Sequence, residues 1–179
     1  MCEYGSKIYS LANGKLIKYI YTEYNYINCI LPWLNKVDKK DYIIQISDDK
    51  IYINNVNEDV LYSELSVEGD GNFIGFIYNK NDKDHLCVSS ACGKVYIWDI
   101  IEKKIFKIIN VGDIDFNIIK WNNRYAIGIH NGLKIIDIEN GNVVSAIKKQ
   151  VYYLKKINHP IYGESLITYD KKNFSLWTL

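Results

Sequence analysis

A short strand-like segment recurs five times along this chain of 179 residues, at nearly constant spacing. The copies are Ile8–Leu11, Ile51–Asn54, Val95–Asp99, Leu133–Asp137 and Phe174–Thr178, and their first residues lie 43, 44, 38 and 41 positions apart. A period near 40 residues that is built from short strands is typical of a repeat architecture. Function is therefore expected to lie in the loops that such repeats display.

The chain between these copies also predicts strands. From Ile27 to Leu65, four apolar runs are separated by polar turns, at 27–33, 41–47, 50–56 and 60–65. The same four-strand pattern is predicted for 73–110 and 116–147, and a three-strand pattern for 151–179. The runs are five to seven residues long and rich in β-branched and aromatic residues, which disfavours helix. The expected fold class is all-β.

Turn residues and inner strands support this prediction. The pairs Asn13-Gly14, Asn131-Gly132 and Asn140-Gly141 favour tight hairpin turns, because Asn and Gly both tolerate a positive φ. The run Tyr42–Ile46 is almost continuously apolar. Such a run is expected where both faces of a sheet are covered by neighbouring sheets.

Composition narrows the possible partners and location. The chain has 22 Lys and Arg against 21 Asp and Glu, so no single-sign field attracts nucleic acid or an anionic membrane. Short lysine pairs, Lys148-Lys149 among them, are interpreted as solvated turns. No signal peptide or membrane span is recognisable, and the four cysteines lack metal-site spacing. We expect a cytoplasmic protein in a reducing compartment, with no cofactor and no bound metal.

Several segments carry residue types that occur in catalytic or ion-binding sites, and each has a structural interpretation. They are Asp48-Asp49, Gly69–Asn72, Asn79–Asp84 and the strand that contains Asp84, His85, Ser89 and Ser90. The first three are predicted to be turns or hairpin loops. The residues of the fourth alternate between the two faces of one strand, so they cannot converge as a triad. The chain is therefore not expected to be an enzyme.

The segment Leu86–Ile109 resembles a WD repeat of the β-propeller class. Small residues precede a turn at Cys92-Gly93, the strand Val95–Asp99 ends in Trp-Asp, and an apolar outer strand follows. The segments 7–20 and 133–147 resemble the outer hairpin of such a repeat. First strands end in an aromatic residue at Trp33, Tyr78 and Trp121, which is again similar to the family. The resemblance covers roughly residues 2–179.

The resemblance also has gaps. The family's Gly-His dipeptide is absent, and Trp-Asp is intact only at Trp98-Asp99. The polar network that joins His, turn and Trp in each repeat is therefore expected to be mostly missing. Stability is expected to depend on apolar packing between the sheets.

The resemblance implies a propeller of four-stranded antiparallel blades, with about four blades present. The expected segments are the end of one blade (1–22), three blades (23–67, 68–111 and 112–148) and a last blade that lacks its outer strand (149–179). One arrangement is part of a larger ring, which predicts self-association or a complementary half-propeller. The other is a closed four-bladed ring, in which 15–20 pairs with 174–179.

The function that the resemblance implies is a non-catalytic scaffold for protein–protein interaction. Partners are expected at the loops that enter first strands and at those between second and third strands. The candidate residues in these loops are Asn25, Tyr26, Asp48, Asn72, Asp115, His130, Tyr152 and Asp170. Alternatives are a regulatory propeller module of a larger enzyme or sensor, and a small-ligand site in a central channel.

Overall fold

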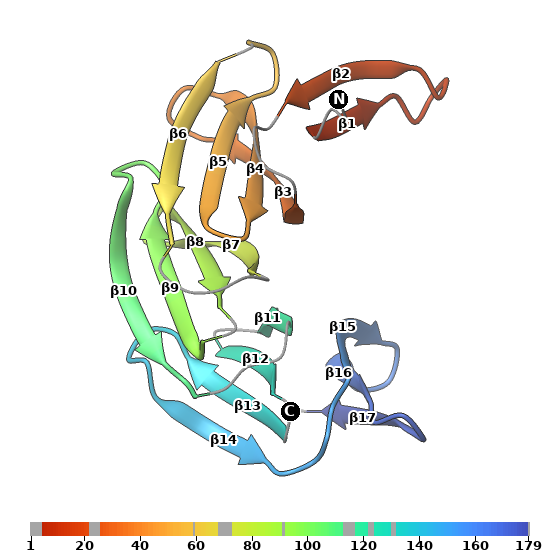
Figure 1. The fold of residues 1–179 in the computed structure, drawn as a ribbon. Helices are drawn as coiled ribbons and strands as arrows, with labels where there is room; N and C mark the ends of the chain where they lie inside the picture. The colour runs from red at the N-terminus through yellow and green to blue at the C-terminus, as the bar shows by residue number, and fades with distance from the viewer. Residues whose placement is uncertain are drawn as a thin grey trace. The chain divides into compact units, whose positions relative to one another are not determined.

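The structure is a computed structural model that describes residues 5–21, 26–58, 60–67, 73–90, 92–112, 117–121, 124–129 and 132–178. Within these ranges every regular element is a β-strand and no helix occurs (Figure 1). The predicted all-β fold class is therefore confirmed for this part of the chain. The chain divides into two compact units, Met1–Gly71 and Asn72–Leu179.

The first unit contains a hairpin and a four-stranded sheet. The hairpin consists of β1 (Gly5–Tyr9) and β2 (Leu16–Tyr21). The sheet consists of β3 (Ile27–Asn35), β4 (Lys40–Ser47), β5 (Lys50–Asn55) and β6 (Leu61–Ser66), which pair antiparallel in chain order.

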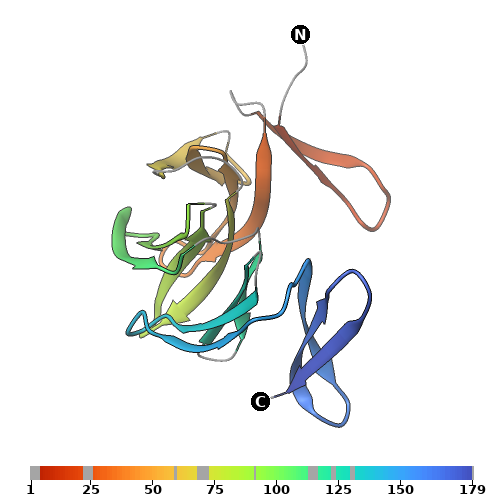
Figure 2. The same cartoon turned by 60° about the horizontal axis from the view of Figure 1, so that its bottom comes forward.

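In its described residues the second unit contains three antiparallel sheets, each with its strands in chain order. The first is β7 (Ile74–Lys80), β8 (Lys83–Ser89), β9 (Lys94–Asp99) and β10 (Lys104–Asn110). The second is β11 (Asn117–Trp121), β12 (Arg124–Ile129), β13 (Gly132–Asp137) and β14 (Val143–Ile147). The third is β15 (Tyr153–His159), β16 (Gly163–Tyr169) and β17 (Phe174–Thr178), which form a separate small sheet after β14 (Figure 2).

The predicted strands are confirmed, with differences at their ends. The first strand was expected at Ile8–Leu11, but β1 ends at Tyr9 and Leu11 is fully exposed in the following turn. The turn closes there because Gly14 donates a backbone hydrogen bond to Ser10 O at 2.8 Å. Gly14 and Gly141 have φ values of 69° and 80°, as the Asn-Gly turns predicted. Asn131 lies outside the described residues.

Four hairpins carry the same irregularity at the same place. The pairing shifts by one position between β1 and β2, β5 and β6, β9 and β10, and β13 and β14. The residue that the shift leaves out always lies on the outer strand and is apolar: Ile17, Tyr62, Phe106 and Val144. A bulge strengthens the local twist of a strand pair. Its recurrence shows that the sequence repeat is also a structural repeat.

The bulged Tyr62 packs near Trp33, an aromatic residue two positions before the end of β3, and near Tyr42 on β4. Its ring centroid lies 4.9 Å from that of Tyr42 and 6.2 Å from that of Trp33. In the sheet of β7–β10 the corresponding residues are Tyr78, His85 and Phe106, in which His85 lies 5.2 Å from Tyr78 and 5.3 Å from Phe106. His85 is thus part of an aromatic cluster.

The core of the second unit lies between its sheets. Ile97 and Cys87 of β7–β10 pack in one cluster with Ile118 and Ile136 of β11–β14. On the opposite face of β11–β14, Leu133 packs in a second cluster with Leu154 and Leu166 of β15–β17. The sheet β11–β14 is therefore covered on both faces. Burial raises the pKa of the Cys87 thiol well above its ordinary value.

A buried chain of hydrogen bonds joins the hairpin to the sheet in the first unit. Gln45, which is fully buried, donates from Nε2 to Ser6 Oγ at 2.6 Å. Its Oε1 accepts from Asn54 Nδ2 at 2.9 Å. Both halves of the Gln45 amide are satisfied, which a buried amide requires because an unpaired polar group there is costly.

We expect Ile97→Ala to destabilise the second unit by about 2–5 kcal/mol, because it leaves a cavity in the cluster between two sheets. Chemical denaturation followed by tryptophan fluorescence measures the loss. Ile108→Ala is the matched control, because Ile108 lies on β10 and is 45% exposed. An equal loss in both variants would contradict the assignment of the core.

Candidate functional site

Two kinds of loop meet at one end of each sheet, as the antiparallel pairing requires. In β3–β6, Ile27 at the start of β3 pairs with Ser47 at the end of β4. In β15–β17, Tyr153 at the start of β15 pairs with Tyr169 at the end of β16. In these two sheets the start of the first strand and the turn between the second and third strands therefore lie at the same end, which we call the loop end.

At the loop end of β3–β6, Asp48 holds the turn between β4 and β5. Its Oδ1 accepts a hydrogen bond from Asn28 Nδ2 at 2.8 Å, so it ties this turn to the start of β3. Ser47 Oγ closes the same turn by donating to Lys50 O at 2.9 Å. Tyr26 lies directly before β3 and is 69% exposed. The predicted turn at Asp48-Asp49 is confirmed. Tyr26 is the exposed residue at the same end of the sheet.

At the loop end of β15–β17, Asp170 holds the turn between β16 and β17. Its Oδ1 accepts backbone hydrogen bonds from Asn173 at 2.7 Å and Lys172 at 3.1 Å. Lys171, in the same turn, places Nζ 4.3 Å from the centre of the Tyr152 ring. The structure thus brings the predicted residues Tyr152 and Asp170 to the same loop end.

Lys149 connects this turn to the strand that follows it. Its Nζ donates to Ser175 Oγ at 2.7 Å and lies 3.1 Å from Asp170 Oδ2. It also lies 6.0 Å from the centre of the Trp177 ring, whose Nε1 donates to Thr168 Oγ1 at 2.8 Å. These contacts involve no histidine, so they differ from the network of His, turn and Trp that the family resemblance implies. A lysine supplies the cation.

The contacts of Asp170 favour its ionised form. The backbone hydrogen bond from Asn173 is the main cause, followed by the hydrogen bond from Lys149, and together they lower the pKa of the carboxyl below its ordinary value. A carboxylate with several donors stays charged at neutral pH. The ionised Asp170 carboxylate is therefore held by hydrogen bonds that fix the conformation of the turn between β16 and β17.

Sequence reasoning did not identify Lys149. The sequence pattern predicts that Lys148 and Lys149 are both solvated, but only Lys148 is exposed, since Lys149 is partly buried by its contacts. The sequence of a lysine pair does not indicate which lysine is solvated and which one contacts other residues. Lys149 contacts Ser175 and Trp177 because the fold places β17 beside the segment that precedes β15.

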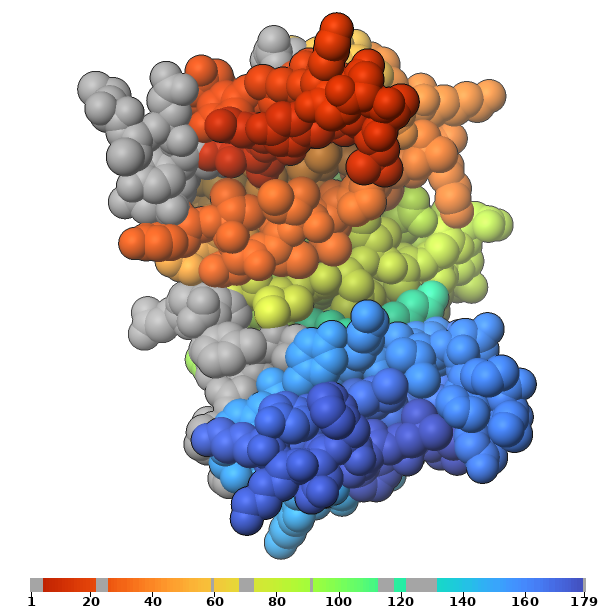
Figure 3. All heavy atoms as spheres, turned by 90° about the vertical axis from the view of Figure 1, so that its right-hand side faces the viewer, coloured from red at the N-terminus to blue at the C-terminus, as the bar shows by residue number. Residues whose placement is uncertain are grey.

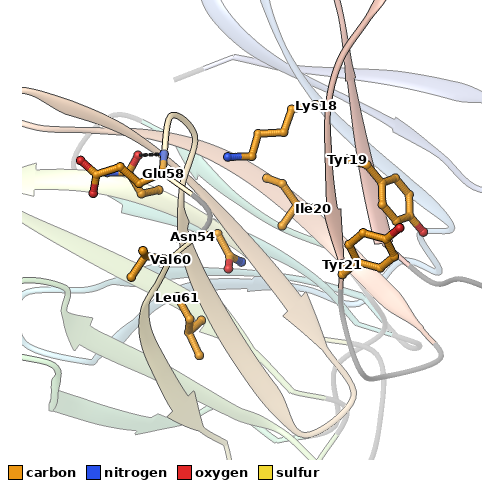
Figure 4. Close-up of a pocket in the computed structure, with 9 residues that line it drawn as sticks. Lys18, Tyr19, Ile20, Tyr21, Asn54, Glu58, Val60 and Leu61 are labelled. Atoms are coloured by element: carbon orange, nitrogen blue, oxygen red, sulfur yellow. Dashed lines mark hydrogen bonds between the residues drawn. The ribbon is translucent and has the colours of Figure 1, made fainter.

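A cavity of about 290 Å³ lies in the first unit between β2 and the β5–β6 hairpin (Figure 4). In Figure 4, Lys18 and Ile20 point from β2 toward the sheet, where Asn54, Val60 and Leu61 face them. The cavity is slightly smaller than typical sites for small molecules, which measure about 300–1,000 Å³. No predicted site residue lies there.

Four of the eight predicted site residues lie outside the described residues: Asn25, Asn72, Asp115 and His130. The segment Gly69–Asn72 lies outside them as well. The other four, Tyr26, Asp48, Tyr152 and Asp170, lie at the loop ends of two sheets. Their role in binding stays a prediction.

The residue types of a catalytic triad do not come together on β8. His85 is buried in its aromatic cluster, and its Nδ1 lies 3.2 Å from Lys83 O. Ser89 donates to Ile74 O, and Ser90 contacts Cys92 and Lys94 O. The loop 80–83 is the expected hairpin turn, in which Asn81 has a φ of 50°.

Within the described ranges, no group of three or more His, Cys, Asp or Glu residues has the arrangement of a metal site. The same part of the chain has no helix, and so none that is long and apolar enough to span a membrane.

Comparison with known proteins gives a fold but no family. No protein-family model matches the chain. An uncharacterized protein of Schizosaccharomyces pombe is 27% identical over 118 residues, a match that covers 58% of this chain and only 12% of that protein. The crystal structure of the computationally designed Ika8 protein matches 97% of this chain and 52% of its own, with 12% identity and a TM-score of 0.69. The chain thus spans a small part of the first protein and about half of the second.

We expect Lys149→Met to lower the free energy of unfolding at pH 7 and to shift the NMR signal of the Trp177 indole N–H, because Asp170 and Ser175 lose their shared cation. The pKa of Asp170 is lowered in the folded state, so its contribution is present above the ordinary pKa near 3.8 and is lost as the pH falls. The difference between wild type and variant should therefore shrink below about pH 4.

Lys148→Met is the control, because Lys148 is the neighbouring exposed lysine. Denaturation at pH 7 and pH 3 measures both variants. If Lys148→Met is as destabilising as Lys149→Met, or if the Lys149→Met effect is independent of pH, the network does not stabilise the sheet.

Proposed function

We propose that this chain is part of a WD-type β-propeller that acts as a non-catalytic scaffold for protein–protein interaction. The recurrence of one bulged outer hairpin carries the proposal: its bulged residues Ile17, Tyr62, Phe106 and Val144 lie 45, 44 and 38 positions apart. Three of these hairpins close a four-stranded antiparallel meander, and the fourth, β1–β2, is a two-stranded sheet in the described part of the chain. Propeller blades are sheets of this kind.

The loop end of each sheet is proposed as a binding surface in its own right. Loops carry most binding residues on rigid β scaffolds, because they tolerate change while the strands hold them in place. In two sheets the turn between the second and third strands is fixed by an aspartate, Asp48 or Asp170. A tyrosine lies next to each turn, Tyr26 at 69% and Tyr152 at 37% exposure. Tyrosine is enriched at the centres of protein interfaces.

The partners of this surface are proposed to be other proteins. The near-equal numbers of acidic and basic residues provide no field for nucleic acid or an anionic membrane. Cys87 and Cys92 are free thiols, which suits the proposed cytoplasmic and reducing location.

A second function has a specific observation in its favour. The yeast relative is matched over only 12% of its length, so in that protein a similar segment is a small part of a much longer chain. A regulatory module of a larger enzyme or sensor would fit that arrangement. In this case deletion of the segment from the longer protein should change regulation while an activity located elsewhere persists.

We expect the full chain with both Tyr26→Ala and Tyr152→Ala to recover its protein partners in at least tenfold lower amounts. Truncation of an interface tyrosine often costs more than 1 kcal/mol of binding free energy. Affinity purification with quantitative mass spectrometry measures the loss. The control is Tyr162→Ala, because Tyr162 is 60% exposed in the turn between β15 and β16, at the opposite end of the sheet. Partners that are kept by the double variant, or lost equally in the control, would contradict the proposed surface.

A further inference from the structure

Four lysines gather at the loop end of the sheet β15–β17. Lys148 and Lys149 precede β15, and Lys171 and Lys172 lie in the turn between β16 and β17. The fold joins the two segments, because Lys149 Nζ lies 3.1 Å from Asp170 Oδ2 in that turn. In Figure 3 the part of the chain after β14, in blue, lies on the surface of the second unit. We call these four residues the lysine cluster.

The positive charge of the lysine cluster is only partly balanced. The carboxylate of Asp170 already pairs with Lys149, and the Asp170 side chain is only 16% exposed. The other three lysines, Lys148, Lys171 and Lys172, are exposed, and in the described part of the chain none of them pairs with a carboxylate. The loop end is therefore basic, although the net charge of the whole chain is only +1.

The ring of Tyr152 helps to position one of these lysines. Lys171 Nζ lies 4.3 Å from the centre of the ring, and a cation over the face of an aromatic ring is attracted to it. Lys171 remains exposed, so its ammonium group can also pair with a carboxylate from outside. Binding then orders this side chain at a lower entropic cost, because the ring already limits its movement.

The loop end of β3–β6 has a different charge. Asp48 and Asp49 form its turn, and the lysine that follows them, Lys50, pairs with Glu64 at 2.6 Å. Two loop ends in the same position of their sheets thus carry opposite charges. Charge complementarity selects partners and suppresses wrong ones, so each loop end is expected to select a different partner.

We propose that the lysine cluster binds an acidic segment of a partner protein, an inference that rests on the proposed role of the loop ends in protein binding. Charge complementarity carries it, since the ammonium groups of Lys148, Lys171 and Lys172 lie at one loop end without a carboxylate partner among the described residues. Successive Asp or Glu residues of a partner supply such carboxylates, and hydrogen bonds between ionised groups are stronger than neutral ones.

Nucleic acid fits this surface less well. Single-stranded nucleic acid is bound largely through aromatic rings on which its bases stack. The two rings here already face lysines, since Tyr152 lies 4.3 Å from Lys171 Nζ and Trp177 lies 6.0 Å from Lys149 Nζ. The nearly balanced charge of the whole chain also provides no long-range attraction to a phosphate backbone.

Fluorescence anisotropy with a labelled hexaglutamate peptide tests the proposal on the full chain. The wild type should bind this peptide and should not bind a hexaglutamine peptide. Binding should weaken as salt is added, because exposed charges are screened beyond about 8 Å at physiological ionic strength. Lys171→Gln with Lys172→Gln should weaken binding by about threefold to tenfold, since each exposed ion pair contributes little by itself.

Lys103→Gln with Lys104→Gln is the matched control. It also removes two adjacent lysines beside a hairpin turn, so the net charge of the two double variants is the same. The first lysine of each pair has a positive φ, 56° at Lys103 and 72° at Lys171. Lys171→Gly separates folding from binding: glycine adopts a φ of 72° without strain, so this variant should fold as well as the wild type and still bind the peptide more weakly.

Four results would each overturn the proposal. They are a wild type that does not bind the hexaglutamate peptide, an unchanged affinity in the Lys171 variants, an equal loss in the Lys103 and Lys104 control, and binding of a single-stranded DNA of the same charge as tightly as the peptide. Circular dichroism and thermal unfolding show that each variant compared is folded.

The proposed function is tested separately, by the recovery of partners with the tyrosine variant. If that variant loses its partners while Lys171→Gln with Lys172→Gln keeps both the partners and the peptide, the loop ends bind proteins but the acidic partner is wrong. If the tyrosine variant keeps its partners, the proposed binding surface is wrong whatever the peptide does.

Discussion

The apolar contact between stacked sheets is the interaction on which the second unit depends. The sheet β11–β14 shows it most clearly, since Ile118 enters the cluster with β7–β10 while its neighbour Ile119 packs against the cluster with β15–β17. Successive residues of a strand point to opposite faces, so one short strand contributes to two cores. Full burial of each such side chain stabilises the fold by roughly 1.5–3 kcal/mol. The loops at the strand ends are positioned by this packing.

Polar side-chain contacts have a different task in each unit. In the first unit Gln45 satisfies both halves of its amide with Ser6 and Asn54, and so specifies how the hairpin β1–β2 joins the sheet. In the second unit Lys149 joins Asp170 to Ser175 and holds a loop end. Both contacts cross between segments that are distant in sequence. They therefore define a particular packing, while the apolar clusters provide most of the stability.

Much of the fold was predictable from the sequence because the signals are local. Alternating and continuous apolar runs give strands, and Asn-Gly pairs give turns, as Gly14 and Gly141 confirm. The candidate site was less predictable. Asp48 and Asp170 were correctly placed in turns, but Lys149 and the cavity beside Asn54 were missed. Lys149 contacts Ser175, which lies 26 residues further along the chain, and the cavity lies between β2 and the β5–β6 hairpin. A local sequence pattern does not show which distant side chains come into contact.

The sequence by itself determined the all-β class, the order of the strands and the turns between them, because each follows from the conformational preferences of a few adjacent residues. Only the tertiary structure decided which apolar face is packed and which is open. Leu166 and Ile167 are adjacent, similar in size and equally apolar, yet one lies in a core and the other lines an open groove. Burial depends on the neighbouring sheet, and a single strand contains no information on whether that sheet is present on both sides.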